Sequence, residues 1–485
     1  MSHRLPDQEP ESRPERAPRP RPATARPRPP AAPPPDPTPK APKPQAPAPG
    51  HHHHHDHGGD IPGTLARYAR PAVIVVLAIA ALFIAVGAIM TWPSDDDHPI
   101  PLQFQSSDGG PLKIYDATVV SQTRADCSVI DSGTPTAEYP MIPTTGGPCI
   151  ATVLHIDSGP DSGKYAALSI PTNAAQSGSG PGSQAVGTGA PDDPQPGQPS
   201  LSVDDQIRVS AMPSHSVDST PDSSTYAFYD YTRGSPLIFW AVAFVLAVVV
   251  VATWRGLRAI VGLAVAFAVL GFFTLPSILD GHDVVLVALV SAAAILFVVL
   301  YLAHGVSLRT SAALVGTLAS LVVAGFLSSA AIASLQLTGL SADSTKSLQL
   351  YQGTLSLNGL LLAGFVIGTL GVLNDVTITQ ASATFELAAM PGQTRLGAFR
   401  AAMRVGRDHI ASTVYTLVFA YAGSALPLLL LFSVAAQPVS SLLTSEEVAI
   451  ELARAFVGGI ALALSVPLTT AVAAALVVPG GKQVE

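Results

Sequence analysis

Seven predominantly apolar stretches follow one another between residues 236 and 478, and they constrain the fold more than any other feature. Each is long enough to cross a hydrocarbon core of about 30 Å as a helix. Only 12% of the residues are charged, which is far below the share in soluble proteins. The chain is therefore expected to be an α-helical polytopic membrane protein. The predicted spans are 236–253, 257–278, 284–302, 311–335, 355–373, 411–432 and 448–478, the last of them broken near Pro467.

An eighth span is predicted at 72–90, inside the segment 67–91, where it would serve as a membrane anchor. Arg67 and Arg70 precede it and Trp92 follows it. Basic flanks mark the cytoplasmic side of a span, so the segment after Trp92 is predicted to lie outside. The later loops agree, because their basic residues alternate, and both termini of this cell-membrane protein are predicted to be cytoplasmic. The cytoplasmic set is Arg255, Arg258, Arg309, Arg395, Arg400, Arg404, Arg407 and Lys482.

Residues 92–235 are predicted to form one small extracytoplasmic all-β domain. Short β-prone runs alternate there with Gly, Pro, Asp and Ser. The runs are 112–121, 149–156, 164–170, 206–210 and 226–231. Cys127 and Cys149 are the only cysteines, and on the oxidising side of a membrane they are candidates for a disulfide. Residues 173–200 are rich in Gly, Ser, Pro and Gln and are interpreted as a flexible insertion.

Residues 1–66 are rich in Pro, Arg and His and are predicted to be a disordered cytoplasmic tail, matched by a short cytoplasmic C-terminus at 479–485. The Pro-rich part offers sites for a protein partner, and the competing interpretation is a solvated tail near anionic lipid. Histidines 51–55 and the acidic run 95–97 carry metal-ligand types, but solvated tracts of this kind do not impose a ligand geometry. We predict no metal site and no cofactor.

The stretch 355–390 is the most informative part of the sequence. Its first half is apolar, whereas its second half places four polar residues within about 60° of one another on a helix. These are Asp375, Thr379, Ser382 and Glu386, here called the polar stripe. A straight helix over the whole stretch would exceed a bilayer, so it must project from the membrane or break, and Gly371 is the favoured break point. Carboxylates beside a membrane are functional candidates unless they are paired or hydrated.

Two further periodic sets accompany the polar stripe. Gly364, Gly368 and Gly371 recur at helical spacing, which is typical of close packing by a neighbouring helix. Arg400, Arg404 and Arg407 share one helix face, here called the basic face. That face could hold an anionic ligand or pair with Glu386, and the alternative is that it only sets topology and contacts lipid headgroups.

Three long stretches of the sequence carry distinctive motifs. They are Gly368–Ser382 with Glu386–Leu387, Gly406–Ile410 with Thr416–Leu417 and Ala420–Pro427, and the approach to the second span at Tyr226–Arg233. These motifs resemble the YibE/F family of bacterial multi-pass membrane proteins. The resemblance covers about residues 112–478 without the insertion, and it implies the membrane architecture but no biochemical activity. Two positions depart from the pattern, because Asn374 stands where an acid is expected and Tyr415 where an asparagine is expected.

Nucleotide-binding, zinc-protease and nucleophile-elbow motifs are missing from the sequence. An intramembrane hydrolase built on Ser382, Asp408 and His409 has no fixed geometry, so we predict no enzyme and no catalytic residue. Binding to nucleic acid is not expected, because the charge of −8 arises from the outer segment. The favoured hypothesis is a secondary permease for a small solute or ion that uses Asp375 and Glu386. The alternative is a non-catalytic membrane platform whose outer domain and tail bind partners.

Overall fold

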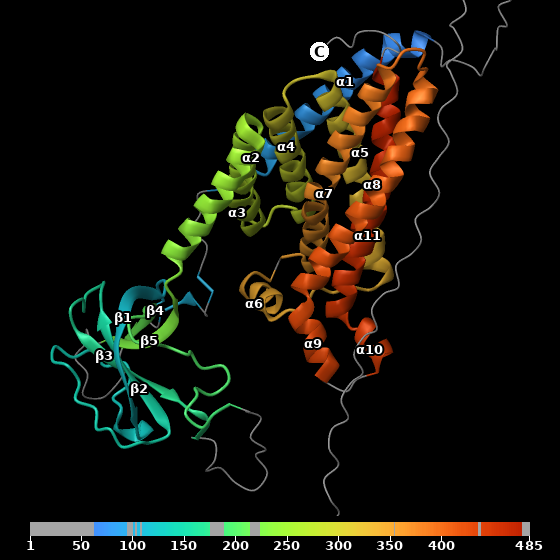
Figure 1. Ribbon diagram of the computed structural model, residues 1–485. Coiled ribbons are helices and arrows are strands. Elements are labelled where there is room, and N and C mark those ends of the chain that lie inside the picture. Colours follow the sequence, from blue (N-terminus) through green and yellow to red (C-terminus); the bar gives the residue numbers. More distant parts are fainter. Residues whose placement is uncertain are drawn as a thin grey trace, which may run out of the picture. The chain divides into compact units, whose positions relative to one another are not determined.

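The computed structural model describes residues 63–94, 100–101, 104–106, 109–174, 189–213, 224–353, 355–434 and 438–477. The predicted tail up to residue 62, with its histidine tract, lies outside the described residues. So do the acidic run 95–97, residues 175–188 of the predicted insertion and the C-terminus from residue 478. Most of the described chain is helical, and a five-stranded antiparallel sheet occurs between the first two long helices (Figure 1).

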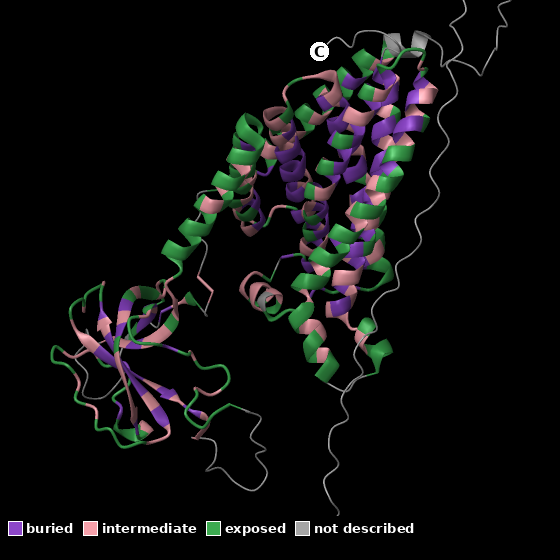
Figure 2. Ribbon diagram, in the orientation of Figure 1, coloured by how far each residue is buried: buried purple, intermediate pink, exposed green. Residues whose placement is uncertain are grey.

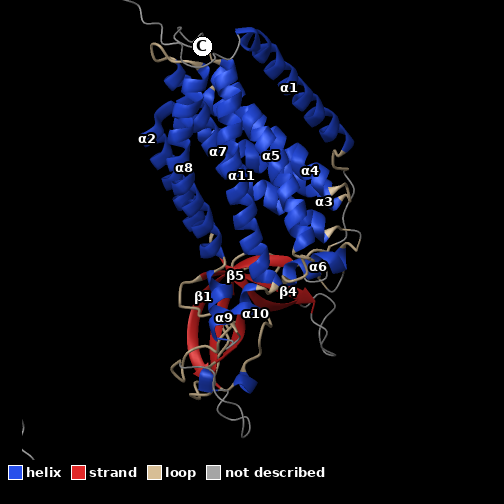
Figure 3. Cartoon of the chain, turned by 90° about the vertical axis from the view of Figure 1, so that its right-hand side faces the viewer, coloured by secondary structure: helices blue, strands red, loops and turns tan. Residues whose placement is uncertain are grey.

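The sheet contains the five strands that the sequence predicts, in the spatial order β3-β2-β1-β4-β5. They are β1 (Lys113–Ala125), β2 (Cys149–Ile156), β3 (Tyr165–Pro171), β4 (Gln206–Pro213) and β5 (Ser224–Tyr231). Every pairing is antiparallel, and β1 pairs with both β2 and β4. Figure 3 shows this sheet in red. The alternation of apolar and polar residues turns one face inward, where Val119, Leu154, Ile207 and Val209 are fully buried.

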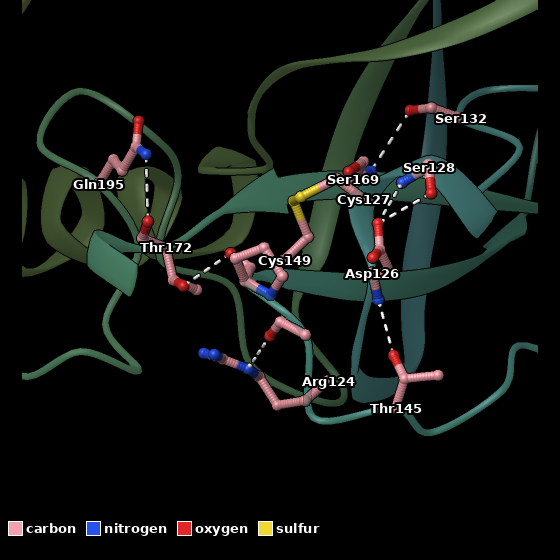
Figure 4. The surroundings of a disulfide bond; sticks show 12 residues. Arg124, Asp126, Cys127, Ser128, Ser132, Thr145, Cys149, Ser169, Thr172 and Gln195 are labelled. Atoms are coloured by element: carbon pink, nitrogen blue, oxygen red, sulfur yellow. Dashed lines mark hydrogen bonds between the residues drawn. A yellow bond between two sulfur atoms is a disulfide. The ribbon is translucent and has the colours of Figure 1, made fainter. Parts of the chain in front are cut away.

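Cys127 and Cys149 are joined by a disulfide, with 5.2 Å between their Cα atoms. The bond connects the short turn after β1 to the first residue of β2. Figure 4 shows that Asp126 also fixes this turn, because its carboxylate accepts from the backbone N–H of Ser128 at 3.0 Å and its own N–H donates to Thr145 at 2.8 Å. The two strands are thereby held both by their ladder and by a covalent link.

The helices account for most of the remaining described chain. They are α1 (Gly63–Met90), α2 (Gly234–Val269), α3 (Leu275–Leu279), α4 (Val284–His304), α5 (Leu308–Ser334), α6 (Asp343–Tyr351), α7 (Leu357–Ala388), α8 (Arg395–Ser424), α9 (Leu426–Val434), α10 (Val439–Leu443) and α11 (Glu446–Leu476). A π-helical turn at Leu270–Thr274 joins α2 to α3. Six described helices are long and apolar enough to cross a membrane, or up to seven if the bent pair α8–α9 forms one span.

The helix from Gly234 to Leu279 covers two of the predicted spans, 236–253 and 257–278. It has a non-helical residue at their boundary, since Thr253 has φ 55° and ψ −134°. The chain reverses there: a Cβ on Gly256 would lie 2.5 Å from the carbonyl oxygen of Val248, whereas eight residues of straight helix separate atoms by about 12 Å. This geometry supports two antiparallel segments, and the total of eight spans stays a prediction.

Helices α5, α7 and α11 pack against one another along most of their lengths, with α8 against α7 and α11 and α4 against α2 and α7. Both ribbon views show α5, α7, α8 and α11 side by side (Figures 1 and 3). Small residues at the contacts permit this close packing; Ala312, Ala324, Ala381 and Ala461 are completely buried. Buried residues gather on α4, α5, α7 and α11, whereas α2 is mostly exposed (Figure 2).

Four details of the sequence prediction are corrected. Helix α7 does not break at Gly371 but continues to Ala388. Helix α11 continues through Pro467, because its packed neighbours hold a turn that lacks one backbone hydrogen bond. The predicted span 411–432 instead bends by 58° between α8 and α9, where Pro427 cannot donate to the preceding turn. The segment between the predicted spans 311–335 and 355–373, for which no helix was predicted, contains the short helix α6.

Candidate functional site

A cavity of about 670 Å³ lies at the N-terminal end of α7, between this helix, α4 and the C-terminal end of α5. Its volume is in the range of small-molecule sites. About half of the lining is polar, and every polar side chain in it is uncharged. The lining comprises Val285, Ser329, Ile332, Ala333, Gln336, Leu337, Thr338, Ser356, Asn358, Gly359 and Leu362. Such a surface offers hydrogen bonds without an electrostatic preference for either sign of charge.

Local hydrogen bonds fix the rim of the cavity. The hydroxyl of Ser356 accepts from the N–H of Gly359 at 3.1 Å and so caps α7. On the other side, the carboxylate of Glu446 holds the loop that follows α5. It accepts from the N–H groups of Thr338 and Gly339 at 2.5 and 2.7 Å, and from the Thr338 hydroxyl at 2.8 Å. The first residue of α11 therefore anchors a wall of the cavity.

Buried polar side chains continue from the cavity end into the packed helices α5, α7 and α11. They are Thr317, Ser320, Ser328, Thr369, Thr377, Gln380, Thr384, Ser465, Thr469 and Thr470. Most hydroxyls donate to a carbonyl of their own helix, one turn earlier. This set could not be recognised from the sequence, because isolated Ser and Thr residues in apolar runs give no periodic signal.

Three contacts join these helices through the buried polar residues. Thr317 and Thr377 place their hydroxyl oxygens 2.5 Å apart. The amide of Gln380 donates to the Thr470 hydroxyl at 2.7 Å and to the carbonyl of Ala402 at 3.0 Å, so one side chain links α7 to both α11 and α8. In a membrane such bonds stabilise helix association.

The polar stripe lies on the outer surface of α7. Asp375, Thr379 and Glu386 are exposed, and Ser382 is half-buried. The side-chain carboxylate of Glu386 accepts from the guanidinium of Arg309 at 2.9 Å. Periodicity thus predicted the shared face, and the structure turns that face away from the packed interior.

The end of α4 places Asp375 relative to the apolar part of the bundle. The first residues of α4 lie against the start of α7, where a Cβ on Gly359 would be 3.3 Å from that of Val284. The last residue of α4, His304, is within electrostatic range of Asp375. Since α4 has 21 residues, about the length of one crossing, the part of α7 after Asp375 extends about 20 Å beyond its end.

The basic face also points outward, because Arg400, Arg404 and Arg407 are all exposed on α8. Among the ion pairs of the described residues, none involves these three arginines. The sequence allowed an ion pair between Glu386 and the basic face. In the structure Glu386 instead pairs with Arg309.

The three glycines at helical spacing lie on the same exposed face of α7, directly before the polar stripe. A Cβ on Gly364 or Gly371 would meet nothing within 4 Å. Only Gly368 has a close neighbour, since its Cβ would lie 3.0 Å from the hydroxyl of Tyr421. The sequence predicted that a neighbouring helix packs closely against all three glycines. Within the described chain this prediction is wrong at Gly364 and Gly371. At Gly368 the close contact is with the side chain of Tyr421 on α8.

One charged pair was missed by the sequence analysis. Glu451 and Arg454 lie within the predicted span 448–478, and the guanidinium donates to the two carboxylate oxygens at 2.9 and 3.1 Å. Their presence in an apolar helix was the signal that could have identified them. By contrast, no hydrogen bond in the described chain joins Ser382, Asp408 and His409, the set considered for hydrolysis.

The described residues thus form a mostly helical chain with six helices long and apolar enough to cross a membrane, which fits a membrane protein. They also form a separate antiparallel β-sheet and a cavity lined by uncharged residues between three of the helices. Residues 240–479 match the family model described as YibE/F-like protein. The chain belongs to the YibE/F-like family through this helical region, which confirms the resemblance for the motifs inside it. The motif at Tyr226–Arg233 lies outside the match, so its resemblance stays a prediction. The comparisons with curated proteins and with solved structures give no match.

Proposed function

We propose that the protein is a membrane permease for a small polar solute without net charge. The cavity at the start of α7 carries this proposal, because it combines a ligand-sized volume with uncharged hydrogen-bonding side chains. Substrate sites of transporters occur where helices begin or end inside a bundle. A solute that carries hydroxyl or amide groups fits the lining better than an ion does, because the lining contains no charged side chain.

The remainder of the route would follow α7. This helix starts at the cavity, carries buried polar groups in the middle and ends in the polar stripe. Hydroxyls that now bond to their own helix can exchange that partner for a passing solute. Asp375 and Glu386 remain the candidates for acid chemistry at the far end of α7. In this proposal the protein has no enzymatic activity.

The outward position of the polar stripe and of the basic face favours a second candidate, the non-catalytic platform. Exposed charges on a helical projection, with three arginines outside the described ion pairs, fit the docking of a soluble partner. This candidate does not use the cavity. A variant that fills the cavity therefore separates the two functions.

The test compares the solute pools of cells that lack the protein with cells that express wild type, Ser329→Trp or Ser334→Trp. Ser329 lines the cavity, whereas Ser334 lies at the end of the same helix, outside the lining. We expect wild type and Ser334→Trp to change the level of the same uncharged solute, and Ser329→Trp to lose that effect. Identical solute pools in all strains at matched membrane levels would refute the permease and favour the platform. The variant Asp375→Asn then tests the far end of the route.

A further inference from the structure

An irregularity in strand pairing decides which side chains of β1 face away from the core of the sheet. Val119 pairs with Leu154, and both belong to the buried inner face, whereas Ser121 pairs with Val153. Paired residues of neighbouring strands point to the same face. The bulge between Val119 and Ser121 therefore turns Ser121, and with it Thr123, to the opposite side of the sheet, here called the back face.

A second cavity, of about 360 Å³, lies between the back face and the loop that joins β1 to β2. Its lining is Ser121, Thr123, Tyr139, Pro140, Met141, Ile142, Pro143 and Val153. The hydroxyls of Ser121 and Tyr139 bond to each other, whereas the hydroxyl of Thr123 is buried without a hydrogen-bond partner among the described residues. A buried hydroxyl without a partner is unfavourable, so an occupant that supplies this bond is favoured.

The loop wall of this cavity is held in place on both sides. Before the wall, Thr136 and Tyr165 exchange two backbone hydrogen bonds of 2.7 and 2.8 Å. After it, the hydroxyl of Thr145 accepts from the backbone N–H of Asp126 at 2.8 Å (Figure 4). The disulfide closes the same loop. A ligand therefore meets a preformed site, and its binding orders little of the chain.

A row of three rings continues from the cavity along the back face. The rings of Tyr139 and Tyr165 meet edge to face with centroids 5.4 Å apart, and the ring of His155 meets that of Tyr165 at the same separation. His155 pairs with Tyr165 and lies two residues after Val153, so it shares their face. Asp157 contacts the Nδ1 atom of His155 at 2.7 Å, which leaves the Nε2 atom for a ligand.

The chemistry of this surface matches a sugar ring. The faces of a pyranose ring carry C–H groups and its edge carries hydroxyls, so the ring packs on apolar and aromatic side chains while its edge bonds to polar ones. The cavity has three hydroxyls, five apolar side chains and no charged one. An apolar peptide side chain is the competing occupant, but it would leave the hydroxyl of Thr123 without a partner.

We propose that the back face of the β-sheet is a binding site for an uncharged glycan. One sugar ring occupies the cavity over Thr123, and the next rings of the chain lie along Tyr139, Tyr165 and His155. The site shares no residue with the cavity at α7, so it stands or falls independently of the permease proposal.

The experiment is saturation-transfer NMR on the full-length protein in lipid nanodiscs, with empty nanodiscs as the blank. The probes are cellotetraose, maltotetraose and tetra-N-acetylchitotetraose, each at up to about 5 mM. A peptide with the sequence of residues 28–38 represents the competing class of ligand, because proline-rich segments dock on aromatic grooves.

Three variants locate the binding. Thr123→Val keeps the shape of the side chain and should weaken glycan binding about fivefold, through the loss of one hydrogen bond. Tyr139→Ala removes a wall and the first ring of the row and should weaken binding by about tenfold or more. Tyr229→Ala is the matched control, because Tyr229 is an exposed tyrosine of β5 outside the cavity lining, and it should bind as wild type does.

Binding of a tetrasaccharide in this order of variants would support the proposal. The absence of a signal from all three tetrasaccharides would overturn it, as would equal binding by wild type, Thr123→Val and Tyr139→Ala. Binding of the peptide alone would also overturn it and would assign the back face to a protein partner. Because Thr123→Val deletes a hydroxyl that has no partner in the sheet, its weaker binding cannot be attributed to lost folding.

Discussion

The loop between α5 and α6 should depend on a single carboxylate for its position. Glu446 accepts hydrogen bonds from both N–H groups of Thr338 and Gly339 and from the Thr338 hydroxyl. Hydrogen bonds to a charged acceptor contribute about 1.5–3 kcal/mol each, and the lower end or less applies at this partly exposed rim. With about 1 kcal/mol for each of three bonds, Glu446→Ala should lower the free energy of opening this loop by about 3 kcal/mol.

The assay is amide hydrogen exchange of the full-length protein in lipid nanodiscs. A change of about 3 kcal/mol corresponds to exchange at Thr338 and Gly339 that is faster by about two orders of magnitude. Glu447→Ala is the matched control, because Glu447 lies in the same first turn of α11 and makes the same contribution to the helix dipole. Equal exchange at the loop in the two variants would refute the reasoning that the carboxylate bonds, and not the dipole, hold this wall.

Three further outcomes are expected. Both Gly368→Ala and Gly364→Ala gain the higher helix propensity of alanine, but only Gly368→Ala has to displace the hydroxyl of Tyr421. The free energy of unfolding of Gly368→Ala should therefore be lower than that of Gly364→Ala by about 1 kcal/mol, and equal melting temperatures of the two variants would contradict this. Burial opposes the ionisation of Asp161, but hydrogen bonds from Lys164 and Tyr226 outweigh it and lower the pKa of its carboxyl. The β-sheet should therefore lose stability as the pH falls below about 4, and Asp161→Asn should reduce that acid dependence in hydrogen exchange. Cys127→Ser should destabilise the sheet by about 3 kcal/mol, estimated from the 22-residue separation of the cysteines, in chemical denaturation followed by exchange.

The sequence was most informative where length and alternation alone determine structure. Apolar stretches of about twenty residues predicted the long helices, and short β-prone runs between turn residues predicted all five strands. Helix α6 was missed because it is short and amphipathic. The predicted break at Pro467 was wrong, because a packed helix tolerates the loss of one backbone hydrogen bond. The bend between α8 and α9 near Pro427 was not predicted.

The candidate site was less accessible to sequence reasoning. Periodicity placed Asp375 and Glu386 on one face, but it does not say whether that face meets solvent or a neighbour. The cavity requires residues from three helices and a loop that are distant in the chain, and nothing local marks them. Glu451 and Arg454 carried a readable signal, because two charges inside an apolar span are costly unless they are paired.

The unbroken course of α7 restricts how the protein can change shape. A helix of 32 residues without a hinge resists bending, so its two ends cannot move independently. A tilt that widens the cavity near Leu357 would swing Glu386 in the opposite direction about the contacts in the middle of the helix. Its pair with Arg309 would then separate or slide. Exposure of one end and closure of the other would thus be a single rigid-body event.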